Sequence, residues 1–332
     1  MSNGVFLTGA TGLLGNAVAR LLLSKGRRVR ALVRNPQKAE NIVPKGCELC
    51  AGDVTDAASV LAAAQGCSVV YHAAGLPEQW LPDPHEFERV NVEGTRHVVA
   101  AAKAIGAERF VYTSTIDVFR FSPPGLPFDE SELDEQPKST YYERSKQKAD
   151  RLVTDAMKEG LPAVFLHPSG IYGRGPLTSP GINLLIIDLV RGKIPMLLEG
   201  TAPVVHSDDV ALGHELAETS APIGGRYILS ESTHSLVGIA EAVRRETQKR
   251  GKPSKVPPVL PLGVAKVVAS VGEWISSYTK KPPLLPKGQL EFVQYGSIPS
   301  SERAQKDLGW KPRPFEQGLS ETLDFLKAEG KI

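Results

Sequence analysis

Tyr142 and Lys146 are the two side chains whose types and spacing are best suited to moving a proton. They stand four residues apart in Tyr142-Glu-Arg-Ser-Lys146, so a helix places them on one face. An ammonium beside a phenol favours the phenolate, and we therefore expect Lys146 to lower the pKa of Tyr142. Tyr142 could then exchange a proton with a carbonyl or alcohol oxygen. The alternative for this pair is a solvated helix face that forms surface ion pairs.

A cluster of hydroxyl groups, Thr113-Ser-Thr115, follows the apolar run that ends at Thr113. A hydroxyl at the end of a strand can hydrogen-bond the reacting oxygen and orient it toward Tyr142. We prefer Thr115 for this role and place Ser114 second. The predicted catalytic residues are therefore Thr115, Tyr142 and Lys146.

Three glycines with the spacing of a phosphate-binding turn lie between the first apolar run and the first helical pattern, in Thr8-Gly-Ala-Thr-Gly-Leu-Leu-Gly15. Gly9 permits a tight turn, Gly12 lets the backbone approach a pyrophosphate, and Gly15 lets the helix pack closely on the strand. The start of the helix offers free N–H groups to the anion, which predicts a dinucleotide site. The residues predicted to bind the pyrophosphate are Gly9, Thr11, Gly12, Leu13, Leu14 and Gly15.

The residue after the second predicted strand distinguishes the two common dinucleotides. An NAD site places a carboxylate there for the ribose 2′-hydroxyl, whereas Arg34 supplies a planar cation suited to a 2′-phosphate. We expect NADP(H), with NAD(H) as the alternative if Arg34 is simply solvated. Lys146 would then hold the nicotinamide ribose in addition to acting on Tyr142.

Further cofactor contacts are expected where other predicted strands end, because ligands of such sheets bind beyond the carboxyl ends of the strands. The residues concerned are Asp53 and Val54 near the adenine, the small residues Ala73, Ala74 and Gly75, and the hydroxyl residues Thr113 and Ser114.

The elements that must position these residues alternate between short apolar runs and helical patterns. Strands are expected at 5–7, 29–33, 47–51, 68–72, 109–113, 163–167 and 226–229, and helices at 13–24, 57–64, 86–104 and 139–159. This alternation predicts an α/β protein with a doubly wound parallel sheet, a Rossmann fold, and a smaller, mainly helical C-terminal substrate domain. The predicted nucleotide domain comprises 1–169 and 204–233, and the substrate domain 170–203 and 234–332.

Composition narrows the partners of this 332-residue chain. Its 39 basic and 37 acidic residues give no field that would attract nucleic acid. Three cysteines are typical of a reducing cytoplasm, and the lone Cys47-x-x-Cys50 is better explained by a strand than by a redox pair or half a zinc site, so no metal is expected. No signal sequence or membrane-spanning run is evident, which predicts a cytoplasmic protein without stable membrane insertion. The apolar segment 264–274 is interpreted first as a packed helix, with contact to a membrane surface or a greasy substrate as the alternative.

Together these segments resemble extended short-chain dehydrogenases/reductases over nearly the whole chain. The resemblance rests on TGATGLLG, the Thr-Ser-Thr cluster, YERSK, His167-Pro-Ser-Gly-Ile-Tyr-Gly173, Val205–Ala211 and Ala304–Pro312. The stretch 33–36 is similar to the dihydroflavonol-reductase-like and 3β-hydroxysteroid-dehydrogenase-like branches, whose matching arginine contacts the 2′-phosphate. The resemblance implies that Pro168, Ser169 and Ile171 border the nicotinamide, and related folds suggest a homodimer formed through two helices of each chain.

Departures from the family pattern narrow the reaction. Gly170 stands where sugar-nucleotide members often carry an asparagine that holds the substrate diphosphate, and Ile116 replaces the first acid of the dehydratase Thr-Asp-Glu motif. His167 stands where many members have arginine. Asn91 is open between a cofactor contact and a helix-structural role. We expect Asp208 or Asp209 to cap the following helix rather than bind metal.

The predicted reaction is hydride transfer between a nicotinamide and a ketone or secondary alcohol. The substrate is expected to be hydrophobic, polyketide-, acyl-, flavonoid- or steroid-like, because the loops expected to cover the site are rich in apolar residues. These residues are Leu76, Trp80, Leu81, Phe119, Phe121, Leu126 and Phe128. One alternative is a nucleotide-sugar epimerase that uses the same Tyr-Lys pair, and another is a redox-sensing protein that binds NADP(H) without chemistry.

Overall fold

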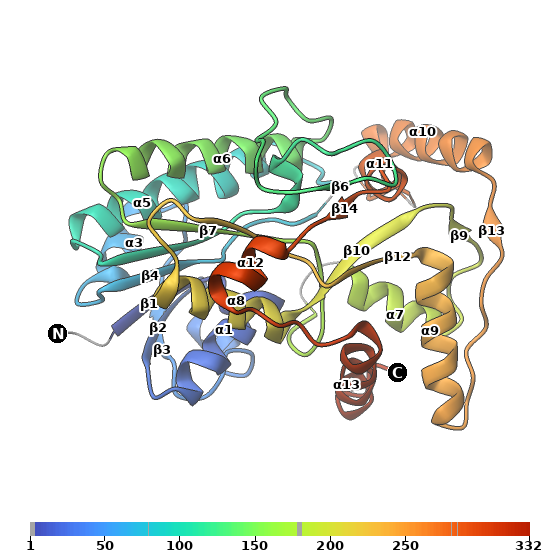
Figure 1. The fold of residues 1–332 in the computed structure, drawn as a ribbon, viewed down its shortest axis with the longest axis horizontal. Helices are drawn as coiled ribbons and strands as arrows, with labels where there is room; N and C mark the ends of the chain where they lie inside the picture. Colours follow the sequence, from blue (N-terminus) through green and yellow to red (C-terminus); the bar gives the residue numbers. More distant parts are fainter. Residues whose placement is uncertain (1–3, 79, 178–180, 280, 284) are drawn as a thin grey trace.

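A seven-stranded sheet, parallel throughout, forms the centre of the larger part of the molecule (Figure 1). The computed structural model describes residues 4–78, 80–177, 181–279, 281–283 and 285–332. The strands lie in the order β11-β7-β5-β4-β1-β2-β3, so the winding direction reverses between β1 and β4. Their bounds are β1 Gly4–Thr8, β2 Arg28–Val33, β3 Glu48–Ala51, β4 Val69–His72, β5 Arg109–Thr113, β7 Ala163–Pro168 and β11 Arg226–Leu229.

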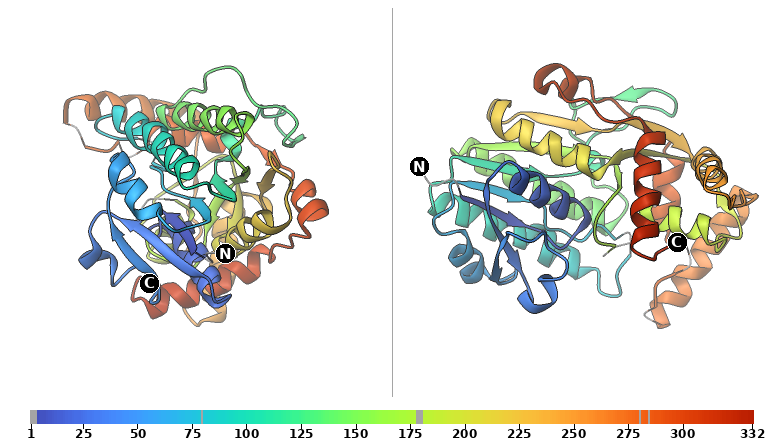
Figure 2. Two further views of the ribbon diagram at one scale, coloured as in Figure 1. Left: turned by 90° about the vertical axis from the view of Figure 1, so that its left-hand side faces the viewer. Right: turned by 90° about the horizontal axis from the view of Figure 1, so that it is seen from below.

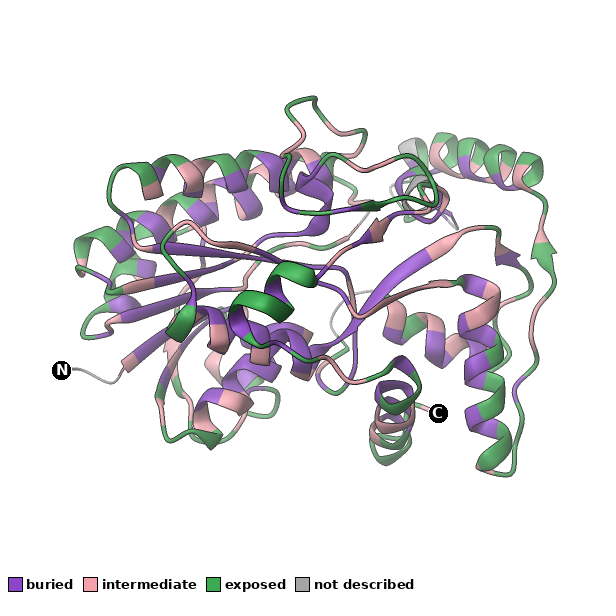
Figure 3. Cartoon of the chain, viewed as in Figure 1, coloured by how far each residue is buried: buried purple, intermediate pink, exposed green. Residues whose placement is uncertain are grey.

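Helices cover both faces of this sheet, as the apolar runs of its strands require. On one face lie α3 (Ala57–Ala64), α5 (Gly94–Ala104) and α6 (Tyr141–Lys158), and on the other α1 (Leu13–Ser24), α8 (Ser207–Ser220) and α12 (Glu302–Leu308), with the short α2 (Pro36–Ala39) beside the β2–β3 edge (Figures 1 and 2). Two buried apolar clusters fill the spaces between sheet and helices, and Figure 3 shows the central strands as mostly buried, whereas the edge strand β3 is partly exposed. The predicted Rossmann fold is confirmed.

The predicted helix 86–104 is interrupted. The chain passes from α4 (His85–Phe87) through a π-helical turn η1 (Glu88–Glu93) into α5. Within the turn the carbonyl of Asn91 accepts a 2.6 Å hydrogen bond from the Thr95 hydroxyl, and the Asn91 side chain is held by the backbone of Leu76. Such π-helical turns are frequent near functional sites.

The rest of the chain forms a second, smaller layer beyond the carboxyl ends of the strands. It holds a three-stranded sheet of order β12-β10-β8, so this part is not helices alone. A third buried apolar cluster joins this sheet to α7, α9 and α13. The elements of this layer, in chain order, are β8 Gly170–Tyr172, α7 Ile182–Val190, β9 Leu197–Leu198, β10 Thr201–His206, β12 Ser232–Ser235, α9 Leu236–Lys249, β13 Val259–Leu260, α10 Leu262–Thr279, α11 Lys287–Gln294 and α13 Phe315–Ala328.

Helix α10 contains the apolar segment for which two interpretations were given. Ala265 and Ala269 are buried in a cluster with Leu285 and Leu290, so one face is packed. The other face is open to solvent: Val267 is 62%, Trp274 65% and Tyr278 73% exposed. Among the residues that the structure describes, no helix is both long enough and apolar enough to cross a membrane.

Candidate active site

The glycine turn lies directly between β1 and α1, where the sequence predicts it. Gly9 adopts a φ of +82°, and the N–H of Gly12 donates a 2.9 Å hydrogen bond to the carbonyl of Gly9. Helix α1 starts at Leu13, and its N-cap residue Gly12 has no side chain to satisfy the first N–H groups. These N–H groups and the positive end of the helix dipole can therefore bind an anion.

Backbone segments approach one another closely around this turn. A Cβ atom at Gly15 would lie 2.2 Å from the carbonyl oxygen of Gly9, and one at Gly9 would lie 2.7 Å from the carbonyl of Ala73. A Cβ at Gly12, in contrast, would have Gly9 O at 3.4 Å as its nearest neighbour. Gly9 and Gly15 thus permit close backbone packing, whereas Gly12 leaves space in front of the helix.

Tyr142 and Lys146 lie in the first turns of α6, as their spacing predicts. Thr140 and Glu143 form a capping box that fixes where the helix begins. The buried Lys146 ammonium donates a 2.9 Å hydrogen bond to the carbonyl of Thr113 at the end of β5. Burial lowers the pKa of Lys146 to about 8, against the attraction of Asp150 and Asp117.

The structure does not show the expected lowering of the Tyr142 pKa by Lys146. Burial first, and then the carboxylate of Asp117, raise the pKa of the Tyr142 phenol above its ordinary value, while a hydrogen bond with Thr115 lowers it. The expectation of a lowered pKa is therefore wrong here. The reason is that the Lys146 ammonium is directed to the Thr113 carbonyl, whereas uncharged surroundings and an acid border the phenol.

The three hydroxyls at the end of β5 and just after it point to three different partners. Thr115 donates a 2.8 Å hydrogen bond to Asp117 and also contacts the Tyr142 phenol. Ser114 donates to Asp150 at 2.7 Å, and the Thr113 hydroxyl lies 2.9 Å from a ring nitrogen of His214. Thr115 is thus the hydroxyl that shares a hydrogen-bond network with Tyr142.

A buried polar network of Arg226, Asp150 and His167 holds the backbone at Thr115. Arg226 on β11 donates to Asp150 at 2.8 Å and lies 3.4 Å from Nε2 of His167, whose Nδ1 lies 3.2 Å from the Thr115 carbonyl. A carbonyl only accepts, so Nδ1 carries the ring hydrogen and Nε2 accepts from the guanidinium. Burial lowers the pKa of His167 to about 3, which keeps the ring neutral.

Sequence reasoning missed Asp150, although it continues the spacing of four along α6 after Tyr142 and Lys146. It noted the position of His167 without assigning a contact. Arg226 is 76 residues from Asp150 and could not have been found by local spacing. The network fixes the peptide of Thr115 and therefore the direction of its side chain.

Asn91 has its side-chain groups in hydrogen bonds with the protein. Its amide nitrogen donates to Ser145 at 2.9 Å and to the Leu76 carbonyl at 3.2 Å, and its oxygen accepts from the Leu76 N–H at 2.7 Å. Of the two interpretations, these contacts support the structural one. The residue connects the loop after β4 to the first turns of α6.

The remaining predicted cofactor residues lie around the same edge of the sheet. The Asp53 carboxylate accepts from the N–H and hydroxyl of Thr55, and Val54 is buried against α5. The N–H of Ala74 donates to the Thr8 hydroxyl, while Ala73 and Gly75 extend from β4. Arg34 follows β2, is exposed and makes no ion pair with any residue that the structure describes.

The residues expected to border the nicotinamide continue from β7 into β8. Pro168 ends β7, and the Ser169 N–H donates to Leu229 at 3.1 Å. The Ser169 hydroxyl is buried and has no hydrogen-bond partner among the described residues. Ile171 pairs with Val205 between β8 and β10.

The expected helix cap at Asp208 or Asp209 is wrong. His206 is the N-cap of α8, and its ring accepts from the Asp208 N–H at 3.3 Å. Asp208 instead pairs with Arg20 and Arg174, and Asp209 accepts from Arg313. Both acids lie in the first turn of the helix, where arginines from distant segments neutralise them.

Some of the apolar residues that were expected to line the substrate pocket belong to the buried core instead. Phe119 is fully buried and Phe128 is 6% exposed, in a cluster with Ile116, Val118 and Ile228. They lie along β6 (Pro127–Phe128) and after the 3₁₀ turn η2 (Ile116–Val118), and β6 pairs with β14 (Ile298–Pro299). Leu126 is exposed, whereas the loop residues Leu76, Trp80, Leu81 and Phe121 are half-buried. The expectation that these residues line a pocket is therefore wrong for Phe119 and Phe128. Their side chains pack in a buried cluster beneath the loop instead.

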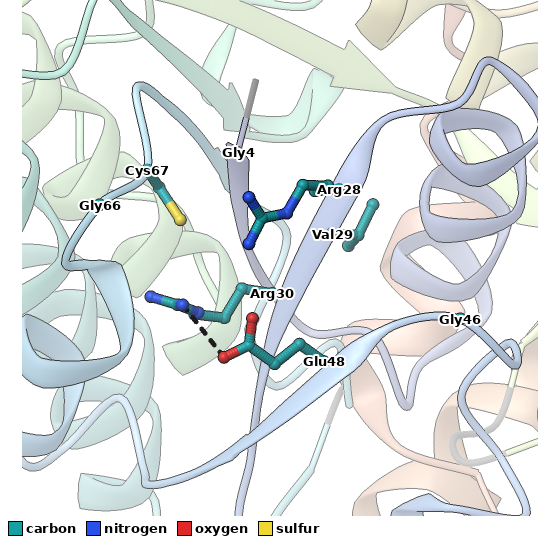
Figure 4. Close-up of a pocket in the computed structure, with 8 residues that line it drawn as sticks. All are labelled: Gly4, Arg28, Val29, Arg30, Gly46, Glu48, Gly66 and Cys67. Atoms are coloured by element: carbon teal, nitrogen blue, oxygen red, sulfur yellow. Dashed lines mark ion pairs between the residues drawn. The ribbon is translucent and has the colours of Figure 1, made fainter. Parts of the chain in front are cut away.

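A surface hollow at the opposite edge of the sheet is separate from this site. Figure 4 shows it between the amino ends of β1, β2 and β3, where Arg30 forms a 3.0 Å ion pair with Glu48 beside Cys67. None of the predicted site residues lines it. The polar groups that could act on a substrate therefore gather at the carboxyl edge, where ligands of doubly wound sheets bind.

Fold and site together define an extended short-chain dehydrogenase/reductase, an enzyme that uses a pyridine nucleotide. The family model described as "NAD dependent epimerase/dehydratase family" matches residues 5–229, and the chain belongs to this family.

The relatives include both reductases and epimerases. A 4-hydroxy-2-methyl-3-oxo-4-farnesyl-3,4-dihydroquinoline-1-oxide ketoreductase from Stigmatella aurantiaca is 28% identical over 98% of this chain and 96% of its own length. The crystal structure of gox2253 is 31% identical, covers 99% of both chains and superimposes with a TM-score of 0.84. A UDP-glucose 4-epimerase from Thermus thermophilus, in complex with NAD, has a TM-score of 0.77 at 23% identity and covers 98% of this chain and 99% of its own; at that identity it shows the shared fold.

Proposed function

We propose that this protein is an NADP(H)-dependent reductase that interconverts a ketone and a secondary alcohol on a hydrophobic small molecule. The observation that carries the proposal is the contact between Thr115 and the Tyr142 phenol beside the buried Lys146, at the carboxyl ends of the strands. The Stigmatella relative, whose name describes a ketoreductase of a farnesylated quinoline, supports the same reaction class.

The residues present fit a dinucleotide. The uncapped start of α1 and the space in front of Gly12 suit a pyrophosphate, and the buried Ser169 hydroxyl, which has no hydrogen-bond partner among the described residues, suits a polar group of the nicotinamide. We assign the pyrophosphate to Gly9–Gly15, the 2′-phosphate to Arg34 and the nicotinamide ribose to Tyr142 and Lys146. When bound, NADPH supplies the hydride that the carbonyl carbon accepts.

The protein's own groups then handle the proton. The Thr115 hydroxyl hydrogen-bonds the substrate oxygen and holds it beside Tyr142. The phenol donates its proton to that oxygen as the carbonyl becomes an alcohol, while Lys146 holds the nicotinamide ribose. In the oxidative direction the same groups return the proton.

The geometry at Gly170 favours this reaction over a nucleotide-sugar epimerase. A Cβ atom there would lie 2.8 Å from the carbonyl oxygen of Pro203, so the asparagine of sugar-nucleotide enzymes has no room. The rival remains the second candidate because the family includes epimerases. A panel of lipophilic ketones and nucleotide sugars, followed by NADPH and NADH absorbance, tests the choice. We expect ketone-dependent NADPH oxidation; turnover of nucleotide sugars without any lipophilic ketone would refute the proposal.

Cofactor preference depends on Arg34. In Arg34→Ala we expect the KM for NADPH to rise about 10- to 100-fold, because a charge-assisted hydrogen bond to the 2′-phosphate is lost. The KM for NADH should stay unchanged. The matched control is Lys38→Ala, because Lys38 is an exposed cation of the same segment whose N–H contacts Asn35. Steady-state kinetics with both cofactors provides the measurement. Equal changes for NADPH and NADH in Arg34→Ala would contradict the assignment.

A further inference from the structure

Asp117 is a buried carboxylic acid next to the reacting groups. It lies in η2, two residues after Thr115, and is 4% exposed. One carboxylate oxygen accepts the Thr115 hydroxyl hydrogen at 2.8 Å, and the other is buried without a hydrogen-bond partner among the described residues. An ionised carboxylate with an unpaired buried oxygen is unfavourable, so this group is poised to take up a proton.

The hydrogen bonds of the Thr115 hydroxyl can be counted. A hydroxyl has one hydrogen to donate and two lone pairs that accept. Its hydrogen is directed to the Asp117 carboxylate, and one lone pair accepts the Asp117 N–H at 3.3 Å. The lone pair that is left can accept from a substrate alcohol. With this arrangement Thr115 has no hydrogen to offer a ketone oxygen.

We propose that the protonation state of Asp117 sets the direction of the Thr115 hydroxyl, and thereby whether the site binds the ketone or the alcohol. This inference rests on the proposed function and makes Asp117 a positioning residue that acts through Thr115. When Asp117 takes a proton from solvent, its own O–H donates to the lone pair of Thr115. The Thr115 hydrogen is then released and can be donated to a carbonyl oxygen. When the proton leaves, the hydroxyl turns back and accepts from an alcohol.

The charges around Asp117 place this proton within the working pH range. Burial and then the carboxylate of Glu143 on α6 raise its pKa, Thr115, Lys138 and Lys146 lower it, and the net pKa is about 6. The same Asp117 carboxylate raises the pKa of the neighbouring Tyr142 phenol, and so does Glu78. Because the pKa is raised, the protonated, ketone-binding form predominates below pH 6 and is lost as the pH rises through 6.

Ketone affinity should therefore depend on pH. With a pKa of about 6, roughly 3% of Asp117 is protonated at pH 7.5 and about 90% at pH 5, so the Kd for a ketone should fall about 30-fold between these values. The affinity for the alcohol should change in the opposite direction. In Asp117→Asn, whose amide does not titrate and can donate to Thr115, the Kd for the ketone should be constant over this range.

The experiment measures these constants by displacement of a ketone inhibitor, and it follows the carboxylic-acid C=O band in infrared difference spectra. The band should appear between pH 7.5 and 5, be absent in Asp117→Asn, and titrate at higher pH in Thr115→Val, where the carboxylate loses a donor. Glu130→Gln is the control, since Glu130 is a buried carboxyl that accepts from the Ile228 N–H instead. It should keep the wild-type pH dependence of ketone binding.

The outcomes separate this inference from the proposed function. Either of two results, obtained with an enzyme that still reduces ketones, would overturn the inference and leave the proposed function in place. One is a ketone Kd with the same pH dependence in wild type and Asp117→Asn. The other is an infrared band unaffected by Thr115→Val. If no ketone is bound or reduced, the proposed function fails, and the infrared titration still reports whether Asp117 and Thr115 are coupled.

Discussion

Replacement of Tyr142 by phenylalanine is expected to lower kcat for ketone reduction about 10²- to 10⁴-fold, the range that a general acid contributes. The phenol contacts Thr115, and the substitution removes its hydroxyl while leaving the ring in place. The ring packs against Phe87 with centroids 6.4 Å apart, so the variant keeps its packing. We expect NADPH affinity to weaken by at most about 10-fold, the loss of one hydrogen bond to the nicotinamide ribose, and the unfolding midpoint to match wild type. Pre-steady-state kinetics with a ketone found in the substrate panel measures the loss.

Tyr141→Phe is the matched control for this prediction. Tyr141 precedes Tyr142 in the same helix, is 57% exposed and has Arg144 over its ring. Its loss should leave kcat within about twofold of wild type, as expected for a surface change. If Tyr142→Phe retained normal turnover, Tyr142 would not be the proton donor, and a redox-sensing role without chemistry would again be open.

The elements that carry Tyr142 and the glycine turn could be predicted because their signals are local. Helix α1 spans Leu13–Ser24 as predicted, and the capping box at Thr140 fixes α6 within two residues of its expected start. Short apolar runs that alternate with helical patterns identified each strand of the large sheet. Local spacing therefore determined both halves of the site.

The chemistry of the site could not be predicted in the same way because it depends on burial and on distant residues. Four-residue spacing predicts that Lys146 and Tyr142 share a face, but not that the ammonium is directed to Thr113. The partner of Asp150 is Arg226, on a strand at the far edge of the sheet. Asp117 was given no role from the sequence, because its burial, with 4% exposed, is known only once the chain has folded.

The wrong helix cap has the same origin. Asp208 and Asp209 are good capping residues by type, but their carboxylates are taken by arginines 188 and 104 residues away in the sequence. His206 then accepts from the Asp208 N–H in their place. Long-range ion pairs decided between two locally acceptable caps, and sequence spacing contains no information about such pairs.

The glycine turn provides the second large effect, because Gly12 and Gly15 should fail in different ways. A Cβ at Gly15 would lie 2.2 Å from Gly9 O, so backbone must move, and we expect Gly15→Ala to destabilise the fold by roughly 3 kcal/mol or more. A Cβ at Gly12 clashes with none of the described residues, and its nearest neighbour, Gly9 O, lies at 3.4 Å. Gly12→Ala should therefore fold normally but lose NADPH affinity by about 100-fold, because the methyl occupies the space assigned to the pyrophosphate.

Thermal unfolding and fluorescence titration with NADPH separate the two effects. Gly26→Ala is the control for backbone strain alone, since Gly26 has a φ of +73° and an added Cβ would have no described atom within 4 Å. It should cost about 1 kcal/mol and leave NADPH affinity unchanged. A Gly12→Ala variant that bound NADPH as tightly as wild type would mean that the pyrophosphate does not lie against the start of α1. The assignments of the nicotinamide ribose to Lys146 and of proton transfer to Tyr142 would then also lose their support, because both depend on where that turn holds the cofactor.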